Sequence, residues 1–237
     1  MEPTPLGGIN VQNNNVQKPE KQKRSKVFIQ KSKKIITKYW YIFSLLVVLI
    51  AAVITWQILE SNRAAAWSKA SDYFSRAEYE QAAKLIKDFP VPSDPDQQRV
   101  YAQTMLATGE LDKAMKGYEE LYDTNKDLSS KLIIGNIYNQ KKEYDKAIVI
   151  YEEIVADNPS TVQAYVNMAT VYRLQGKNKE AIEVAKKAVD ANPQSVTLLE
   201  LHVSMLLEDQ KSEDFKNAVA ALRKVNPNDP LLESLKQ

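Results

Sequence analysis

The side chains in this sequence that could carry out catalysis are few. His202 is the only histidine, cysteine is absent, and the acidic pairs Glu119-Glu120 and Glu152-Glu153 lie in amphipathic stretches. Acid–base chemistry would need such groups beside a partner, but a histidine within Leu198–Leu207 is expected to face a helical core, and acidic pairs on a polar helix face are normally solvated. The missing cysteine excludes disulfides, thiolate metal sites and a lipid-modified cysteine anchor. No glycine-rich phosphate loop is present, so the sequence predicts no enzyme, no metal and no cofactor.

A repeat in the sequence predicts the helices that would hold any functional side chains in place. Asn158-Pro159, Asn192-Pro193 and Asn226-Pro227 recur every 34 residues. The blocks 128–161 and 162–195 align without gaps, and each consists of two apolar helical stripes joined by a short polar turn. Gly176 suits a left-handed turn after the first helix, and Pro193 cannot continue the second. A fixed period of this length is typical of a helical-repeat solenoid, in which each unit buries its apolar face against its neighbours.

These blocks resemble the tetratricopeptide repeat, which combines an aromatic, Leu-Gly, Tyr, a turn Gly, Ala, an aromatic, Ala and Pro over about 34 residues. The block 162–195 supplies Tyr165, Met168-Ala169, Tyr172, Gly176, Ala181, Ala185, Ala188 and Pro193, and 128–161 supplies Ile134-Gly135, Tyr138, Tyr144, Ala147, Tyr151, Ile154 and Pro159. The resemblance implies an all-α fold, a right-handed solenoid of helical hairpins. Gly135, Ala147, Ala169 and Ala181 would lie where paired helices cross most closely.

The match fades toward both ends of the chain. We predict repeats over 95–127, 128–161 and 162–195, and a divergent repeat over 196–229 that has Phe215 where its predecessors have alanine. Residues 61–94 form a degenerate helical hairpin in this prediction, and residues 230–237 a C-terminal tail. Pro90, Pro92 and Pro95 mark a loop between the degenerate unit and the better ones.

A long apolar segment precedes the repeats. Trp40–Leu59 has no charge, proline or glycine, and about 20 residues at about 1.5 Å each span about 30 Å, the thickness of a bilayer core. Aromatic residues at both ends suit the membrane interfaces. The alternatives are a buried core helix and a cleaved signal peptide with Ala64-Ala65-Ala66 as its cleavage site. The segment is longer than a signal peptide's apolar region and the triplet follows several polar residues, so we expect an uncleaved transmembrane helix over 39–60.

Flanking charge predicts the orientation of this helix. Residues 19–38 contain eight bases, whereas 60–79 contain Arg63, Lys69 and Arg76. The positive-inside rule then places the N-terminus in the cytoplasm and the repeats outside it, in a single-pass protein of the cell (inner) membrane. The first 38 residues hold nine basic and two acidic residues and are expected to form a disordered cytoplasmic tail. Topology accounts for these bases, so no nucleic-acid partner is predicted. Because no glycine or proline lies between Pro19 and Pro90, the transmembrane helix is expected to continue into the first repeat helix.

The resemblance also indicates where partners would bind. In this family the first helix of each repeat lines a concave groove, and the corresponding residues here are Arg99, Gln103, Leu132, Asn136, Asn139, Val166, Asn167, Thr170 and Arg173. The family's carboxylate clamp needs lysine or arginine at positions that hold Leu132, Thr197 and Leu201, so chaperone docking by that clamp is not predicted. An extended peptide or a partner helix is the expected ligand.

Two functions fit this sequence. The first is a membrane-anchored scaffold whose extracytoplasmic repeats bind other proteins of a cell-envelope complex, with the lipid bilayer contacted through Trp40–Leu59. The second is a chaperone-like holdase for newly translocated proteins near the translocon. If the topology were reversed, a cytosol-facing membrane receptor would be the alternative.

Overall fold

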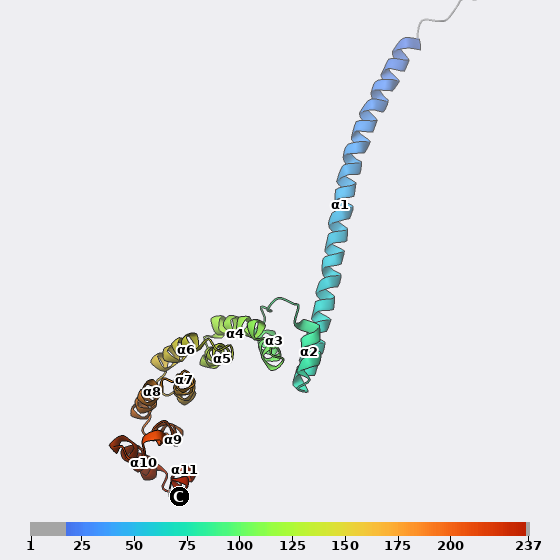
Figure 1. Ribbon diagram of the computed structural model, residues 1–237. Coiled ribbons are helices and arrows are strands. Elements are labelled where there is room, and N and C mark those ends of the chain that lie inside the picture. Colours follow the sequence, from blue (N-terminus) through green and yellow to red (C-terminus); the bar gives the residue numbers. More distant parts are fainter. Residues whose placement is uncertain (1–17, 236–237) are drawn as a thin grey trace, which may run out of the picture. The chain divides into compact units, whose positions relative to one another are not determined.

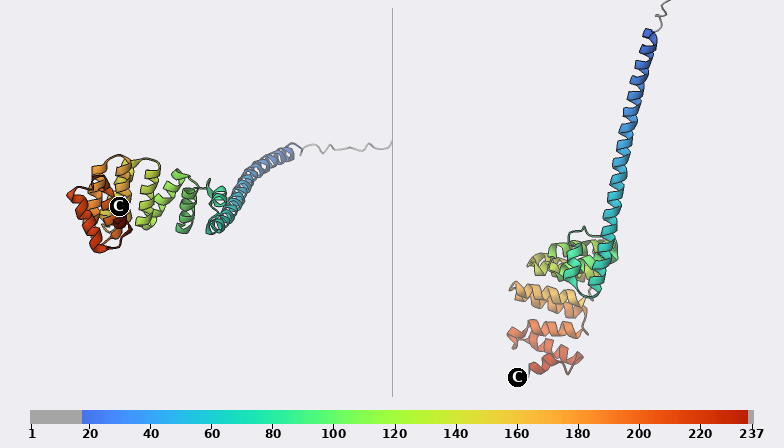
Figure 2. Two further views of the ribbon diagram at one scale, coloured as in Figure 1. Left: turned by 60° about the horizontal axis from the view of Figure 1, so that its bottom comes forward. Right: turned by 90° about the vertical axis from the view of Figure 1, so that its right-hand side faces the viewer.

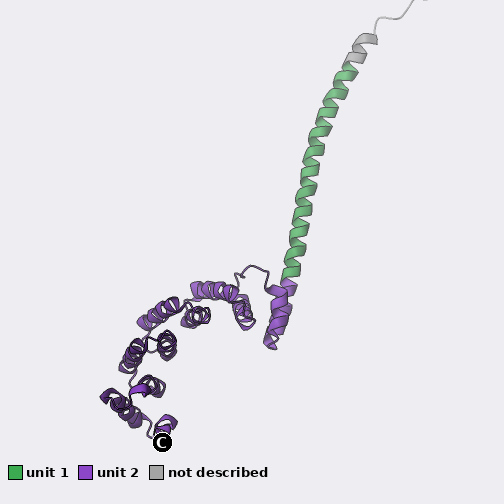
Figure 3. Ribbon diagram, viewed as in Figure 1, with its two compact units in different colours: residues 1–63 green, residues 64–237 purple. Residues whose placement is uncertain are grey.

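The computed structural model describes residues 18–235, with side chains from residue 24 onward, and every regular element in that range is helical. The chain divides into two compact units, residues 1–63 and residues 64–237 (Figure 3). The first unit contains most of the long helix α1, Lys18–Ser75. The second holds the repeats, so the all-α prediction is confirmed for the described residues.

Helix α1 is continuous for 58 residues, as the absence of internal glycine and proline predicts. The predicted disorder over residues 1–38 is therefore wrong for residues 18–38, which form the first turns of this helix. Lysine, glutamine and arginine are good helix formers, and Pro19, the one proline of this segment, lies in the first turn, where proline is tolerated. Residues 1–17 lie outside the described range.

The apolar segment Trp40–Leu59 exposes its side chains, with Trp40 70% and Leu59 67% exposed. Among the described residues, α1 is the one helix long and apolar enough to cross a membrane, and none of its most apolar window is covered by protein. This exposure disfavours the interpretation as a core helix. A signal sequence near an N-terminus would meet the same criteria of length and composition, so membrane anchoring stays a prediction.

The second unit begins with residues 64–75 of α1 and continues through ten α-helices and one 3-10 helix. These are α2 (Tyr79–Ile86), α3 (Pro95–Ala107), α4 (Leu111–Asn125), α5 (Leu128–Gln140), α6 (Tyr144–Asp157), α7 (Val162–Leu174), α8 (Asn178–Ala191), α9 (Val196–Met205), η1 (Leu207–Asp209), α10 (Glu213–Val225) and α11 (Pro230–Ser234). Asp94, Asp127, Ser212 and Asp229 cap four of these helices by accepting a backbone N–H.

These helices pack as consecutive hairpins. α3 pairs with α4, α5 with α6, α7 with α8, and α9 with α10, and each second helix also contacts the first helix of the next hairpin. Figures 1 and 2 show the first helices, α3, α5, α7 and α9, in one row and the second helices, α4, α6, α8 and α10, in another. α5 contacts α7 directly and α7 contacts α9. The row of first helices therefore lies on the inner, concave side of the curved stack (Figure 1).

One backbone conformation recurs in the turns that precede α2, α4, α6 and α8. Ala77, Gly109, Lys142 and Gly176 all have positive φ, between 57° and 77°, and each lies two residues before one of these helices. A Cβ added at Gly109 or Gly176 would have no atom within 4 Å. Glycine at these two positions thus relieves backbone strain and does not serve to make space.

The core follows the helix crossings. Ala147 and Ala169 are fully buried, Ala181 is almost so, and a Cβ at Gly135 would lie 2.6 Å from Cε1 of Tyr151. The predicted need for small residues at these crossings is therefore confirmed. Residues 230–234, part of the predicted C-terminal tail, form α11 instead, and Leu232 is 1% exposed in the last core cluster with Phe215. A terminal helix of this kind covers apolar surface that a further repeat would otherwise cover.

Candidate protein-binding groove

The predicted groove residues all lie on first helices. Arg99 and Gln103 belong to α3, Leu132, Asn136 and Asn139 to α5, and Val166, Asn167, Thr170 and Arg173 to α7. The two arginines are exposed, whereas the other side chains are half-buried. This placement follows from the repeat register, because every first helix faces the inner side of the stack (Figure 1).

A hydrogen-bonded network joins the groove asparagines. The hydroxyl of Tyr151 donates to Oδ1 of Asn136 over 2.8 Å, and Nδ2 of Asn167 donates to the same oxygen over 2.6 Å. Nε2 of Gln163 then donates to Oδ1 of Asn167 over 2.7 Å. The structure thus brings together two predicted residues from α5 and α7. It leaves the Nδ2 group of Asn136 without a hydrogen-bond partner among the described residues.

Two members of this network, Tyr151 and Gln163, were not among the predicted groove residues. Tyr151 matches the aromatic position of the repeat pattern, which predicts a core role and no hydroxyl partner. Gln163 lies four residues before Asn167 on α7, a spacing that places both on one helix face. That spacing is the signal in the sequence that could have revealed Gln163.

The network is uncharged at ordinary pH. Burial raises the pKa of Tyr151 to about 12, although the nearby Asn167 amide acts in the opposite direction. The phenol therefore stays protonated and serves as a hydrogen-bond donor that holds Asn136. Amides and a neutral phenol can position a polar ligand but supply no acid–base catalysis.

Charge is sparse along the predicted groove. Arg99 lies 3.9 Å from Asp96 on its own helix, and Arg173 has no ion pair within 4.0 Å among the described residues. The Thr170 hydroxyl donates to the carbonyl of Val166 over 2.7 Å, so its proton is used within α7. Next to Arg173, Leu174 is 58% exposed. The surface therefore offers amides, two exposed arginines and apolar side chains.

Polar links between successive hairpins keep the groove residues in register. Lys141 Nζ lies 2.7 Å from Oδ1 of Asp112, and one repeat later Nε2 of Gln175 lies 3.0 Å from Oδ1 of Asp145. The Asn-Pro motif adds another link, since Nδ2 of Asn192 donates to the carbonyl oxygen of Pro159 over 2.8 Å. These contacts tie each unit to its predecessor and limit relative movement of the first helices.

The residues first considered for catalysis are not assembled into a site. His202 is half-buried on α9, burial lowers its pKa against the opposing charge of Asp214, and it has no hydrogen bond or ion pair within the described chain. Glu119, Glu120 and Glu152 are exposed on second helices. Across the described residues, no group of three or more histidine, cysteine or acidic side chains could hold a metal ion.

Comparisons with known proteins agree with this geometry. The family model described as tetratricopeptide repeat matches residues 136–235. The TPR repeat-containing protein YpiA of Bacillus subtilis (strain 168) is 25% identical over 162 residues, which are 68% of this chain and 36% of that protein. The chain therefore spans about a third of the length of this curated relative.

Solved structures of MamA are similar in fold. MamA from residue 41 to its end, from Desulfovibrio magneticus RS-1, has 19% sequence identity and a TM-score of 0.52, with 74% of this chain and 97% of that chain covered. A MamA RS-1 double mutant has 16% identity and a TM-score of 0.52, covering 70% and 95%. At this level of identity the likeness concerns the fold of the helical stack alone.

Proposed function

Because this chain belongs to the tetratricopeptide repeat family, we propose that it is a non-catalytic, membrane-anchored scaffold that binds other proteins in its concave groove. The amide network of Asn136, Asn167 and Gln163 on two neighbouring first helices carries this proposal. It is a fixed, uncharged set of donors and acceptors on the inner face of the repeat stack.

An extended segment of a partner protein suits such a surface. Its main chain presents one N–H and one C=O per residue, and asparagine amides can pair with both. The hydroxyl of Tyr151 and the amide of Asn167 already fix the Asn136 carbonyl, so little side-chain freedom remains to be lost on binding. The Asn136 Nδ2 group, Asn139 and Arg173 are then the groups that would contact the ligand.

In this proposal α1 anchors the stack in the membrane through Trp40–Leu59, with the repeats outside the cytoplasm. The exposed apolar surface of this segment and the bases that precede it support that arrangement. A reporter enzyme that is active only outside the cytoplasm, fused after residue 237, tests the orientation. Activity of a matched cytoplasmic reporter at the same point would refute it.

We further propose that the partners belong to a cell-envelope complex, which the scaffold helps to assemble. The polar links between repeats support a fixed docking surface in preference to the adaptable one that a holdase needs. Purification of the full-length protein from membranes should recover one complex in constant stoichiometry. Weak recovery of many unfolded proteins would favour the holdase instead.

Photo-crosslinking from the groove in cells tests the binding surface itself. Asn139→Ala combined with Arg173→Ala should reduce capture about tenfold, because two hydrogen-bonding groups of about 0.5–1.5 kcal/mol each are lost. Asn136→Asp is the sharper single variant, since it keeps the oxygen that Tyr151 and Asn167 use but removes the Nδ2 donor. Lys186→Ala, on an exposed site of α8, is the control. Undiminished capture by both groove variants would place the binding surface elsewhere.

A further inference from the structure

A pocket on the outer side of the stack is separate from the groove. It has a volume of about 250 Å³ and lies between the second helices α6 and α8, with α7 beneath. Buried or half-buried apolar and aromatic residues form its floor, and exposed charged residues form its rim. The floor consists of Val155, Tyr165, Met168, Tyr172 and Val184, and the rim of Glu152, Glu180, Glu183 and Lys187. Drug-sized ligands and cofactors fill about 300–1,000 Å³, so this pocket suits a single long side chain.

The preceding junction, between α4 and α6, fills the corresponding surface with lysines of the chain itself. Nζ of Lys131 lies 3.1 Å from Glu153, 3.5 Å from Asp157 and 5.5 Å from the ring centroid of Tyr122. Its side chain is only 10% exposed. A lysine stem covered by apolar neighbours, with its charge between carboxylates and an aromatic ring, is therefore a contact that this fold already makes.

A second lysine at that junction makes a similar contact. Nζ of Lys146 lies 2.6 Å from Glu143 and 5.3 Å from the ring centroid of Tyr138. The preceding junction therefore balances its carboxylates and aromatic rings with two internal cations.

One period of 34 residues later, both lysines are replaced. Tyr165 stands at the position of Lys131, and Glu180 at the position of Lys146, whereas the ring of Tyr138 is retained as Tyr172. The same shift puts Lys187 at the position of Glu153 and Lys177 at the position of Glu143, so the charges around the retained ring change places. The rim of the α6–α8 pocket then has three carboxylates, Glu152, Glu180 and Glu183, and one cation, Lys187.

The rim has an unbalanced negative charge. Lys187 pairs with Glu183 over 2.9 Å, and Lys177 lies 6.0 Å from the Tyr172 centroid, at the limit of a cation–π contact. Glu152 and Glu180 have no ion pair within 4.0 Å in the described part of the chain. Burial, followed by the charges of Glu152 and Glu180, raises the pKa of Tyr172 against the opposing charge of Lys187, which agrees with an excess of carboxylates close to its ring.

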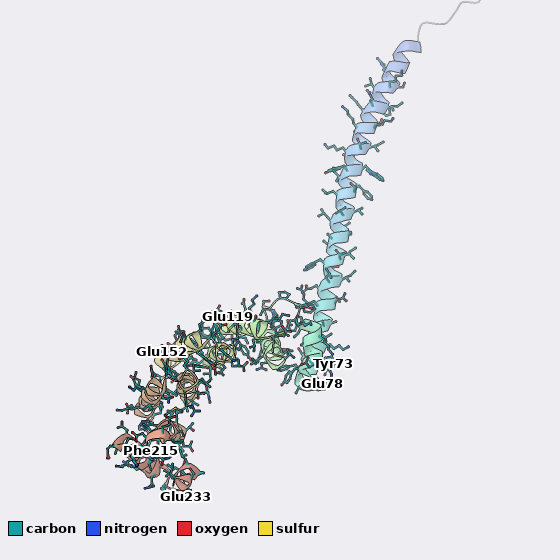
Figure 4. All side chains as sticks on the ribbon, in the orientation of Figure 1. Tyr73, Glu78, Glu119, Glu152, Phe215 and Glu233 are labelled. Carbon is teal, nitrogen blue, oxygen red and sulfur yellow. The ribbon has the colours of Figure 1, made fainter. Side chains whose placement is uncertain are left out.

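We propose that the α6–α8 pocket binds an arginine side chain of a partner protein, with the guanidinium between Glu152, Glu180 and the Tyr172 ring and the stem over Met168. Arginine suits this site because its planar guanidinium stacks on aromatic rings and pairs with carboxylates in two directions. The site lies on the second helices, so a partner bound there leaves the groove free. Figure 4 shows Glu152 on this outer side of the stack.

The test uses the full-length protein in nanodiscs of neutral lipid, which do not attract basic peptides, with 13C-labelled methionine methyl groups. Met168 reports on the pocket floor and Met115, buried on α4, is the internal control. The probe is the peptide acetyl-Gly-Ser-Arg-Ser-Gly-amide, compared with the same peptide carrying neutral citrulline in place of arginine. Glu180→Lys restores the cation of the preceding junction, and Glu119→Lys places the same change on α4.

The arginine peptide should shift the Met168 signal in a saturable way and leave Met115 unmoved, whereas the citrulline peptide should have no effect at equal concentration. Glu180→Lys should weaken binding about fivefold or more, since attraction becomes repulsion, and Glu119→Lys should not. The proposal is overturned by an absent Met168 shift with the arginine peptide, by an equal shift with citrulline, or by equal weakening in the two variants. Its failure would leave the groove proposal untouched, because no groove residue is changed.

Discussion

Lys142 adopts a backbone conformation that glycine adopts one repeat later, and exchanging the two residue types should change stability in opposite directions. Lys142 has φ of 60° and Gly176 has φ of 73°, each in the turn before a second helix. A residue with a Cβ is strained in this left-handed region by about 1–2 kcal/mol. Glycine loses more conformational freedom on folding, which offsets about 0.4–1 kcal/mol of that gain. Lys142→Gly should therefore stabilise the protein by about 0.5–1 kcal/mol.

The reverse exchange should destabilise by a similar amount. Gly176→Ala adds a Cβ that meets no atom within 4 Å, so backbone strain is its only structural cost, about 0.5–1 kcal/mol net. Lys142→Ala is the matched control, because it removes an exposed side chain but keeps the strain. Its unfolding midpoint should stay where that of the unchanged protein lies.

Thermal unfolding of the full-length protein in detergent, followed by far-ultraviolet circular dichroism, measures all three variants. For a unit of this size, 1 kcal/mol corresponds to about 2–4 °C in the midpoint, so Lys142→Gly should raise it by about 1–4 °C and Gly176→Ala should lower it by about the same amount. A lower midpoint for Lys142→Gly would refute the assignment of strain. An equal rise for Lys142→Ala would show that the lysine side chain, and not its φ angle, is the cause.

Three further changes test the packing, the repeat link and the buried phenols. Gly135→Ala places a Cβ 2.6 Å from the fully buried Tyr151 ring. The cost of overpacking, about 1–3 kcal/mol, should exceed the gain in helix propensity of about 1 kcal/mol, so the variant should unfold at a lower urea concentration. An unchanged unfolding midpoint would contradict the crossing geometry. Asn192→Ala removes the bond to the Pro159 carbonyl and should lower the free energy of unfolding by about 0.5–1.5 kcal/mol in the same titration. Asn158→Ala, at the equivalent position one repeat earlier, is the control and should cost less, because its effect is confined to local turn structure. Burial raises the pKa of Tyr118 and of Tyr151 to about 12 from 10.0; because the neutral form is favoured in the folded state, their contribution is intact below pH 10 and lost as pH rises toward 12. Tyr151→Phe should flatten that alkaline decline in stability, and an identical pH profile for the variant would exclude Tyr151 as its source.

The helix bounds of the middle repeats could be predicted from the sequence because several local signals coincide there. Asn-Pro ends a second helix, and Gly135 and Ala181 mark the close crossings, so the register of 128–161 and 162–195 is overdetermined. The end of the stack has fewer such signals. The short α9, the 3-10 turn after it and α11 depend on tertiary packing around Phe215 and Leu232, which a comparison of repeats does not contain.

The Asn-Pro period itself acquires a mechanical reason from the structure. Proline accounts for the end of the helix, but it does not account for the asparagine before it. Asn192 donates across one repeat to the carbonyl of Pro159, whereas Asn226 donates to Asp229, which caps the terminal helix α11. The same dipeptide therefore joins two repeats at Asn192 and holds the terminal helix at Asn226, whereas Asn158 accepts the backbone N–H of Ser160 in its own turn.

Register and chemistry differ in how far a sequence specifies them. Register places Asn136 and Asn167 on facing first helices, because every repeat repeats the same spacing. Register does not specify the hydrogen bonds of these asparagines, because Oδ1 of Asn136 accepts from both the Tyr151 hydroxyl and the Asn167 amide. A substitution that removes this oxygen disturbs the core as well as the groove. A change that tests the binding role of Asn136 must therefore keep the oxygen and remove the amide nitrogen, as Asn136→Asp does at the cost of an added negative charge.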